Sequence, residues 1–252
     1  MVTIEHKLAQ LHARIDAACV AAARPSGSVR LLAVSKTFGG DAVRAAYAAG
    51  EHSFGENYVQ EGIDKIAQLS DLRGRIEWHL IGPLQSNKTR VVAEQFDWVQ
   101  SVDRLKIAQR LSEQRPAGLP PLQVCLQVNI SGEASKSGFL PSGLCEAAHA
   151  VAQLPRLALR GLMAIPEPSA EPVAQRVPHR ALRGWFETLQ AQGLPLDTLS
   201  MGMSDDLEPA IAEGATASAR HSAKLRTDIV RRVFGGVFRA VFRAVFRMGH
   251  LH

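Results

Sequence analysis

LLAVSKT, from Leu31 to Thr37, is an apolar run short enough to form one buried strand, and it ends in a serine and a lysine where a loop should begin. A lysine at a strand end can simply mark the point where the chain reaches water. Alternatively, Lys36 is held among apolar side chains, and its unprotonated amine can condense with an aldehyde to form a Schiff base. Taken alone the stretch favours the first interpretation, so the rest of the chain must decide.

The remaining sequence alternates short apolar runs with helical segments. The predicted strands are LLAVS (31–35), HSFGEN (52–57), IEWHLIG (76–82), FDWVQSV (96–102), LQVCLQVNI (122–130), LRGLMAI (159–165) and DTLSMGM (197–203). Helices are expected between them, near 41–49, 59–69, 87–94, 103–114, 142–153 and 180–192, after an amphipathic N-terminal helix. This order indicates parallel βαβ units.

Seven or eight such units in 252 residues predict a TIM-like (β/α)8 barrel with an extra N-terminal helix. A doubly wound open sheet is the alternative, although no GxGxxG motif follows the first strand. In a barrel, the site lies at the carboxyl ends of the strands. The candidate residues at those ends are Lys36, Asn57, His79, Gly82, Asn129, Ser131, Met163, Ser200, Gly202 and Ser204.

Each candidate also has a purely structural interpretation. Asn57 can cap the helix that follows it, and His79 is more often a core histidine than a metal ligand, since no second ligand stands near it in metal spacing. SMGMSDD (200–206) predicts a strand that turns into a helix N-terminus, where free N–H groups favour an anion. Ordinary helix capping by Ser204 or Asp205 explains the same sequence without an anion.

Composition limits the class of protein. No apolar run is long enough to span a membrane, and three scattered cysteines (Cys19, Cys125, Cys145) without metal spacing predict a reducing, cytoplasmic location. The net charge of +5 comes from the end of the chain: residues 220–252 hold eight bases and one acid, which leaves 21 bases and 23 acids before them. The high pI therefore indicates no nucleic-acid face on the globular part.

Several strings share their order and spacing with one family. LLAVSKT, FGENYVQE, WHLIGPLQSNK, VNISGEASKSGF, GLMAIP and LSMGMSDDLEPAIAEGAT resemble the pyridoxal-phosphate homeostasis protein family, relatives of the N-terminal barrel of alanine racemase. The resemblance covers about residue 3 to Thr216. It implies a barrel that holds pyridoxal 5′-phosphate (PLP) as a Schiff base.

The resemblance also assigns roles to residues. It implies that Lys36 bonds the cofactor, that Asn57 lies beside the ring, and that Ser200 and Gly202 lie near the phosphate. Lys136 and Asn87 fall in family motifs, but no physical role follows for them from the sequence. A strand end inside a barrel mouth would anchor and shield such a lysine.

The resemblance implies a PLP carrier and regulator without a catalytic reaction of its own. Racemisation on PLP needs a second acid or base opposite the lysine, which related racemases take as a tyrosine from a second domain. Here only Tyr47 and Tyr58 exist, and no residues remain for such a domain. A PLP-dependent amino-acid racemase is the alternative. We expect PLP-dependent apo-enzymes as partners of a monomer, with no nucleic-acid partner.

The sequence departs from the family after Thr216. The family continues with a strand containing Arg-Ile-Gly-Thr, whereas this chain has ASARHSAKLRTD, and Arg220 stands one position too late to replace that arginine. We therefore expect a barrel domain over 1–216 whose eighth strand is altered or missing, which would leave unpaired edges on the first and seventh strands. Residues 217–252 are expected to form a divergent basic tail from a changed reading frame.

The tail repeats Val-Phe-Arg at four-residue intervals, in VFGGVFRAVFRAVFR. On a helix this repeat gives a basic amphipathic surface of the kind that binds anionic membranes. Out-of-frame translation gives the same Arg-rich composition, and this second interpretation is the one favoured. No membrane contact through the tail is therefore expected.

Overall fold

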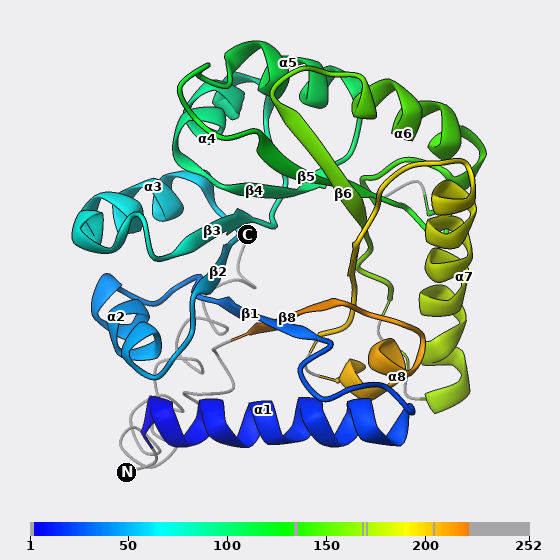
Figure 1. Ribbon diagram of the computed structural model, residues 1–252, viewed down its shortest axis with the longest axis horizontal. Helices are drawn as coiled ribbons and strands as arrows, with labels where there is room; N and C mark the ends of the chain where they lie inside the picture. Colours follow the sequence, from blue (N-terminus) through cyan, green and yellow to red (C-terminus); the bar gives the residue numbers. More distant parts are fainter. Residues whose placement is uncertain (1–2, 134–135, 168, 170, 204, 222–252) are drawn as a thin grey trace, which may run out of the picture. The chain divides into compact units, whose positions relative to one another are not determined.

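The computed structural model describes residues 3–133, 136–167, 169, 171–203 and 205–221. These residues form a closed barrel of eight parallel strands in sequential order, surrounded by helices (Figure 1). The strands are β1 (Arg30–Val34), β2 (Ser53–Glu56), β3 (Glu77–Leu80), β4 (Trp98–Val102), β5 (Leu122–Gln127), β6 (Leu157–Met163), β7 (Thr198–Ser200) and β8 (Ala217–His221). The TIM-like barrel is confirmed, and the open-sheet alternative is wrong because β1 pairs with β8.

Each of the first seven strands is followed by a helix that packs on the outside of the barrel (Figure 1). The helices are α1 (Ile4–Ala21), α2 (Gly40–Ala48), α3 (Val59–Gln68), α4 (Thr89–Gln95), α5 (Leu105–Gln114), α6 (Leu144–Ala152), α7 (Pro172–Ala191) and α8 (Leu207–Ala212). Three short 3-10 turns are η1 (Ser70–Leu72), η2 (Ser86–Lys88) and η3 (Pro141–Gly143).

The extra N-terminal helix is α1. Thr3 caps it, because its side chain accepts a hydrogen bond from the backbone N–H of His6 at 3.2 Å. The helix contacts both α2 and α8, so it covers the outside of β8 and β1 (Figure 1). It thereby completes the ring of helices around the barrel.

The prediction that the eighth strand is missing is wrong. In β8, five residues pair in parallel with β1, from Arg30↔Ala217 to Val34↔His221, and Ser200 of β7 pairs with Ala217. The expected unpaired edges of β1 and β7 are therefore closed. Pairing uses backbone N–H and C=O groups, which every non-proline residue carries, so a segment without the family's apolar side chains can still form a strand.

β8 extends the barrel past Thr216, since its five residues pair like those of the other strands. The reading-frame hypothesis and the amphipathic tail concern residues that, from 222 onward, lie outside the described part of the chain. The expected orientation of the Arg220 side chain also lies outside that description.

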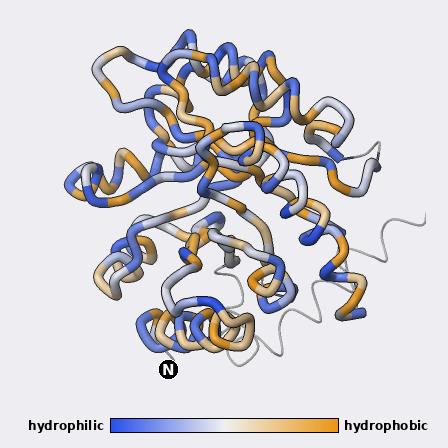
Figure 2. Tube along the Cα trace, turned by 45° about the vertical axis from the view of Figure 1, so that its right-hand side comes forward, coloured by the Kyte–Doolittle hydropathy of each residue, from blue (hydrophilic) through white to orange (hydrophobic). Residues whose placement is uncertain are grey.

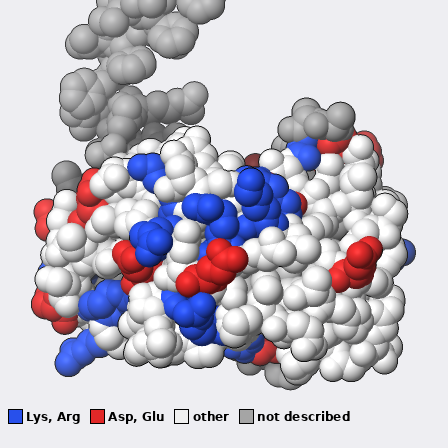
Figure 3. All heavy atoms as spheres, turned by 90° about the horizontal axis from the view of Figure 1, so that it is seen from above, with Lys and Arg blue, Asp and Glu red and all other residues white. Residues whose placement is uncertain are grey.

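The core lies between the barrel wall and the helices, where apolar residues of strands and helices meet (Figure 2). Trp78, Phe54, Phe96, Leu80 and Leu126 are among its largest fully buried side chains. Basic and acidic side chains are mixed on the face seen from the side of α4, α5 and α6 (Figure 3). The described helices include none long and apolar enough to cross a membrane.

Candidate functional site

The carboxyl ends of the eight strands meet at one end of the barrel, because all strands are parallel. We call this end the barrel mouth. Lys36 follows β1 and Asn57 follows β2. Val34 of β1 pairs with Gly55 of β2, so the two strands end at the same level of the barrel. Ser200 ends β7, and Gly202 follows two residues later. The fold therefore brings all four predicted residues to one end of the barrel.

Lys36 occupies a tight turn. The carbonyl of Ser35 accepts a hydrogen bond from the N–H of Phe38 at 3.0 Å, which makes Lys36 and Thr37 the two central residues. Thr37 has φ +68°, the sign that a type II turn requires at its third position. Lys36 is half-buried, and within the described residues no hydrogen bond or ion pair engages its amine.

Two other lysines near the mouth, Lys65 and Lys136, are paired with acids. Lys65 donates to Glu56 at 2.7 Å and to Glu61 at 2.8 Å. Lys136 lies 2.8 Å from a carboxylate oxygen of Glu133. A paired ammonium is a poor nucleophile, since it must give up its proton and its partner first. Of these three amines, Lys36 is the one suited to react with a carbonyl compound.

Asn57 lies where β2 meets the end of β3. A Cβ on Gly82 would lie 2.0 Å from the carbonyl oxygen of Asn57, so only glycine allows this approach. The cap of α3 is Tyr58, without a side-chain hydrogen bond. The interpretation of Asn57 as a helix cap is therefore wrong, and its proposed place beside a ring stays a prediction.

Ser200 is almost fully buried, and its hydroxyl donates to Oε1 of Gln100 at 2.7 Å. The amide of Gln100 in turn lies 3.0 Å from Nδ1 of His79. His79 stacks on Trp98 with ring centroids 5.1 Å apart, as expected for a core histidine. The Ser200 side chain is thus engaged with the barrel interior, and its backbone is the part that adjoins the mouth.

Gly202 is buried, with φ +87°, and a Cβ there would lie 2.5 Å from Cβ of Ala210. The backbone N–H groups on either side are committed, Met201 to a β8 carbonyl at 3.1 Å and Met203 to a carboxylate at 2.6 Å. Among the described residues, the Gly202 N–H has no acceptor. Buried N–H groups are rarely left unpaired, so this donor fits an anionic ligand.

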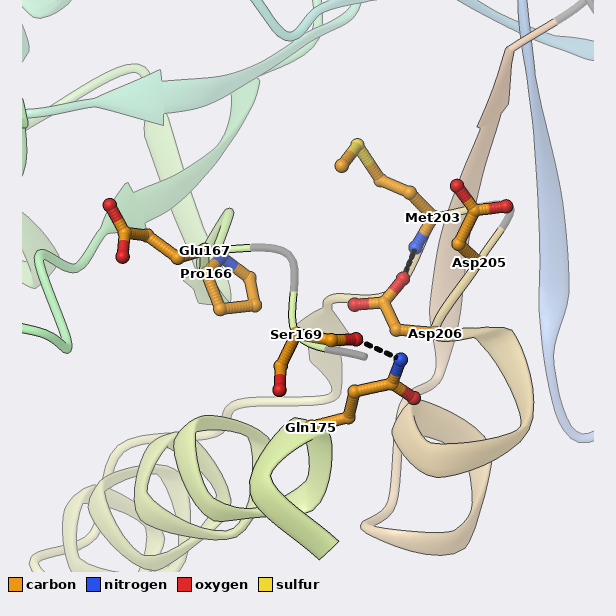
Figure 4. Close-up of a pocket in the computed structure, with 7 residues that line it drawn as sticks. All are labelled: Pro166, Glu167, Ser169, Gln175, Met203, Asp205 and Asp206. Carbon is orange, nitrogen blue, oxygen red and sulfur yellow. Dashed lines mark hydrogen bonds between the residues drawn. The ribbon is translucent and has the colours of Figure 1, made fainter. Parts of the chain in front are cut away.

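Asp206 holds the loop that carries Gly202, and no sequence pattern indicated that its partner is His179. Its Oδ1 accepts from the N–H of Met203 (Figure 4). Its Oδ2 lies 3.0 Å from Nε2 of the buried His179 on α7. Burial alone would raise the pKa of Asp206, but the bonds from His179 and Met203 outweigh it and lower this pKa. The cap position of α8 is Asp206, so the expected cap Asp205 does not begin this helix, and Ser204 lies outside the described residues.

Two cavities open near the ends of β5, β6 and β7. The first, about 60 Å³, lies between Glu167, Gln175 and Asp206 (Figure 4). The second, about 230 Å³, is lined by Asn129 and Lys136, among others. No group of three or more potential metal ligands occurs among the described residues.

The two tyrosines lie at opposite ends of the barrel. Tyr47 packs edge-on against the ring of His52, at 5.1 Å, and His52 precedes β2 at the end away from the mouth. Tyr58 follows Asn57 on the mouth side, where 64% of it is exposed. Neither position matches a buried acid or base that faces Lys36.

Several known proteins resemble this chain in sequence and fold. Residues 7–220 match the family model described as alanine racemase, N-terminal domain. The chain is 63% identical over 216 residues to the pyridoxal phosphate homeostasis protein of Pseudomonas aeruginosa, covering 86% of this chain and 92% of that protein. It is 54% identical over 217 residues to the protein of that name from Escherichia coli K12, covering 86% and 93%.

One solved structure with this fold is PipY of Synechococcus elongatus with PLP bound. It is 38% identical to the chain, with a TM-score of 0.72, and the match covers 82% of this chain and 98% of PipY.

Proposed function

The chain belongs to the pyridoxal phosphate homeostasis protein family, and on this premise we propose that it binds PLP at the barrel mouth as part of PLP homeostasis. The observation that carries the proposal is the half-buried amine of Lys36, uncommitted among the described residues, in the turn after β1. PLP would supply an aldehyde there, and condensation with the amine forms one C=N bond and releases one water. The PLP-bound structure of PipY, a relative 38% identical, supports the same cofactor.

The residues present fit such a ligand on both sides. The N–H of buried Gly202, unpaired among the described residues, suits a phosphate oxygen, and a Cβ at this position would collide with Ala210. Asn57 would lie beside the ring. Ser200 would contribute through its backbone near the phosphate, because its hydroxyl already donates to Gln100.

The experiment is to mix the protein with PLP, reduce with borohydride and map the modified residue by mass spectrometry. We expect the label on Lys36. Lys36→Ala should lose it, whereas Lys106→Ala, on α5 after β4, should keep it. Absence of label from Lys36 in the wild-type protein would overturn the proposal.

We propose that the protein carries and regulates PLP without a catalytic reaction of its own. The names of its relatives support this role. The partially buried Tyr47 packs at the far end of the barrel, and Tyr58 is exposed, so neither supports a second base for racemisation. Incubation with single amino acids while following their stereochemistry tests the alternative of a racemase, and conversion of one enantiomer to the other would establish it.

Delivery of PLP to apo-enzymes, a monomeric state and a cytoplasmic location complete the proposal. The cytoplasmic location is supported by three free cysteines, because free thiols persist in reducing compartments. They are Cys19, Cys125 and Cys145. Size-exclusion chromatography with light scattering tests the monomer. Mixing the PLP-loaded protein with an apo-enzyme and following its recovered activity tests delivery.

A further inference from the structure

Both neighbours of Lys36 are held by one cluster of charged side chains. The ammonium of Lys65 donates to the carbonyl of Ser35 at 2.7 Å and to the carboxylates of Glu56 and Glu61 at 2.7 and 2.8 Å. These bonds use its three donors. We call Lys65, Glu56 and Glu61 the Lys65 clamp.

The two acids of the clamp reach the turn from either side. Glu56 accepts a hydrogen bond from the hydroxyl of Ser35 at 2.5 Å, and Glu61 accepts one from the backbone N–H of Thr37 at 2.5 Å. The residue before Lys36 is therefore bound through its carbonyl and its hydroxyl, and the residue after it through its amide. Lys36 itself is left out of the cluster.

The hydrogen bond to Glu61 comes from the backbone N–H of Thr37, and Thr37 has a strained backbone conformation. Thr37 is β-branched and has φ +68°, a conformation that such residues rarely adopt unless their surroundings impose it. Glycine or asparagine is the usual residue at this position of a turn. Strain of this kind is found at ligand sites more often than elsewhere.

The cluster is also a costly way to gain stability. Lys65 is 4% exposed and Glu56 is fully buried, with its second carboxylate oxygen lacking a hydrogen-bond partner among the described residues. Burial raises the pKa of Glu56, although Lys65 and Ser35 oppose the shift. Buried ion pairs add little stability over apolar side chains of the same size, so a role in positioning is the better explanation.

We propose that the Lys65 clamp is a positioning device for Lys36, which fixes Ser35 and Thr37 so that the amine between them is presented to an aldehyde at the barrel mouth. This inference rests on the proposed function. Without the clamp, Thr37 relaxes from its left-handed conformation, the turn opens, and the amine spends less time where condensation can occur.

The test measures condensation at Lys36 directly. PLP and pyridoxal, which lacks the phosphate, are each mixed with the protein, imine formation is followed by absorbance, and the product is reduced with borohydride and mapped. Glu61→Ala should lower the rate constant at Lys36 about 10- to 100-fold with both aldehydes. An equal loss with pyridoxal separates this effect from damage to the phosphate site.

Rescue separates positioning from general destabilisation. Glu61→Gln keeps an oxygen that can accept from the Thr37 N–H, so it should retain most of the rate. Thr37→Gly combined with Glu61→Ala should recover much of the loss, since glycine adopts positive φ without help. If Glu61→Ala does not fold, Glu61→Ser, whose hydroxyl is too short to reach Thr37, takes its place.

The matched control is Glu187→Ala. It removes an ion pair to Arg183 with the same four-residue spacing on α7, which follows β6 rather than the Lys36 strand, and it should leave the rate unchanged. A wild-type rate in Glu61→Ala, or an equal loss in Glu187→Ala, would overturn the inference while leaving the proposed function intact. A wild-type protein without label on Lys36 would overturn both.

Discussion

Gly202 shows how one missing side chain can shape the barrel mouth. Its positive φ turns the chain after β7, and the 2.5 Å approach of Ala210 leaves no room for a Cβ. Its N–H is unpaired among the described residues, so the same residue provides both the turn and the donor. Lys36 depends in a similar way on its neighbour Thr37, whose conformation makes the turn possible.

Gly202→Ala should therefore lower both stability and PLP affinity. The strained φ and the contact with Ala210 should cost about 1–3 kcal/mol in the free energy of unfolding. Alanine keeps the backbone N–H, but relief of the contact with Ala210 would displace it from the phosphate, which should weaken PLP binding at least about tenfold. Chemical unfolding and fluorescence titration measure the two effects.

Gly193→Ala is the control for Gly202→Ala. Gly193 has nearly the same backbone angle, φ +89°, but nothing within 4 Å of an added Cβ. We expect a loss of about 1 kcal/mol in stability and unchanged PLP affinity. If the two variants bind PLP equally well, Gly202 has no special part in the phosphate site.

At the scale of elements, the loop between β7 and α8 is held by a helix from the preceding unit. Asp206 joins the Met203 N–H to His179 of α7, so the loop depends on a contact across 27 residues of sequence. The Lys65 clamp is a similar contact, since α3 supplies Glu61 and Lys65, which hold the turn after β1. In both places the mouth is shaped by a neighbouring helix.

The Asp206 contact predicts acid sensitivity. Its pKa is lowered below the usual 3.8 in the folded protein, so its ionised form stabilises the fold above that pH, and this contribution disappears as pH falls through the lowered pKa. Asp206→Asn should lose stability at neutral pH, and its difference from the wild type should shrink below about pH 4.

Urea unfolding between pH 2.5 and 7 measures this difference. The control is Asp64→Asn, at an exposed aspartate on α3 that accepts a bond from Gln60 at 3.0 Å, and its difference from the wild type should be small throughout. A difference for Asp206→Asn that stays constant over this range would contradict the role assigned to its ionised form.

At the scale of the whole molecule, closure depends on β8. This strand pairs with β1 along all five of its residues and joins β7 at Ala217. It also supplies Ser218, whose hydroxyl donates to the carbonyl of Gly202 at 3.0 Å. The strand that the sequence pattern did not predict therefore both closes the barrel and supports the loop that carries Gly202.

Two truncations test this. A chain that ends at Thr216 lacks β8, leaves two strand edges unpaired and should lose cooperative unfolding and PLP binding. A chain that ends at His221 keeps β8 and should retain both. Circular dichroism during heating and PLP titration distinguish them. Equal behaviour of the two chains would contradict the role of β8.

Much of the fold could be predicted from the sequence because the pattern is local. Apolar runs such as LQVCLQVNI alternate with amphipathic helices, and each unit carries its own signal. The positions of Lys36, Asn57, Ser200 and Gly202 at the mouth follow from the same alternation, since parallel strands share one carboxyl end. The strand over 217–221 could not be predicted, because ASARH lacks the β-branched and aromatic residues that mark strands.

The sequence by itself therefore determined the barrel class, the strand end that bears Lys36 and the resemblance to a PLP-binding family. Only the tertiary structure decided that β8 closes the barrel, that Lys65 clamps both neighbours of Lys36, and that His179 and Asp206 hold the loop around Gly202. The physical reason is that periodicity reports which face of an element is buried. Backbone pairing at closure and bonds between buried polar side chains depend instead on which distant segments meet, and that is settled when the chain packs.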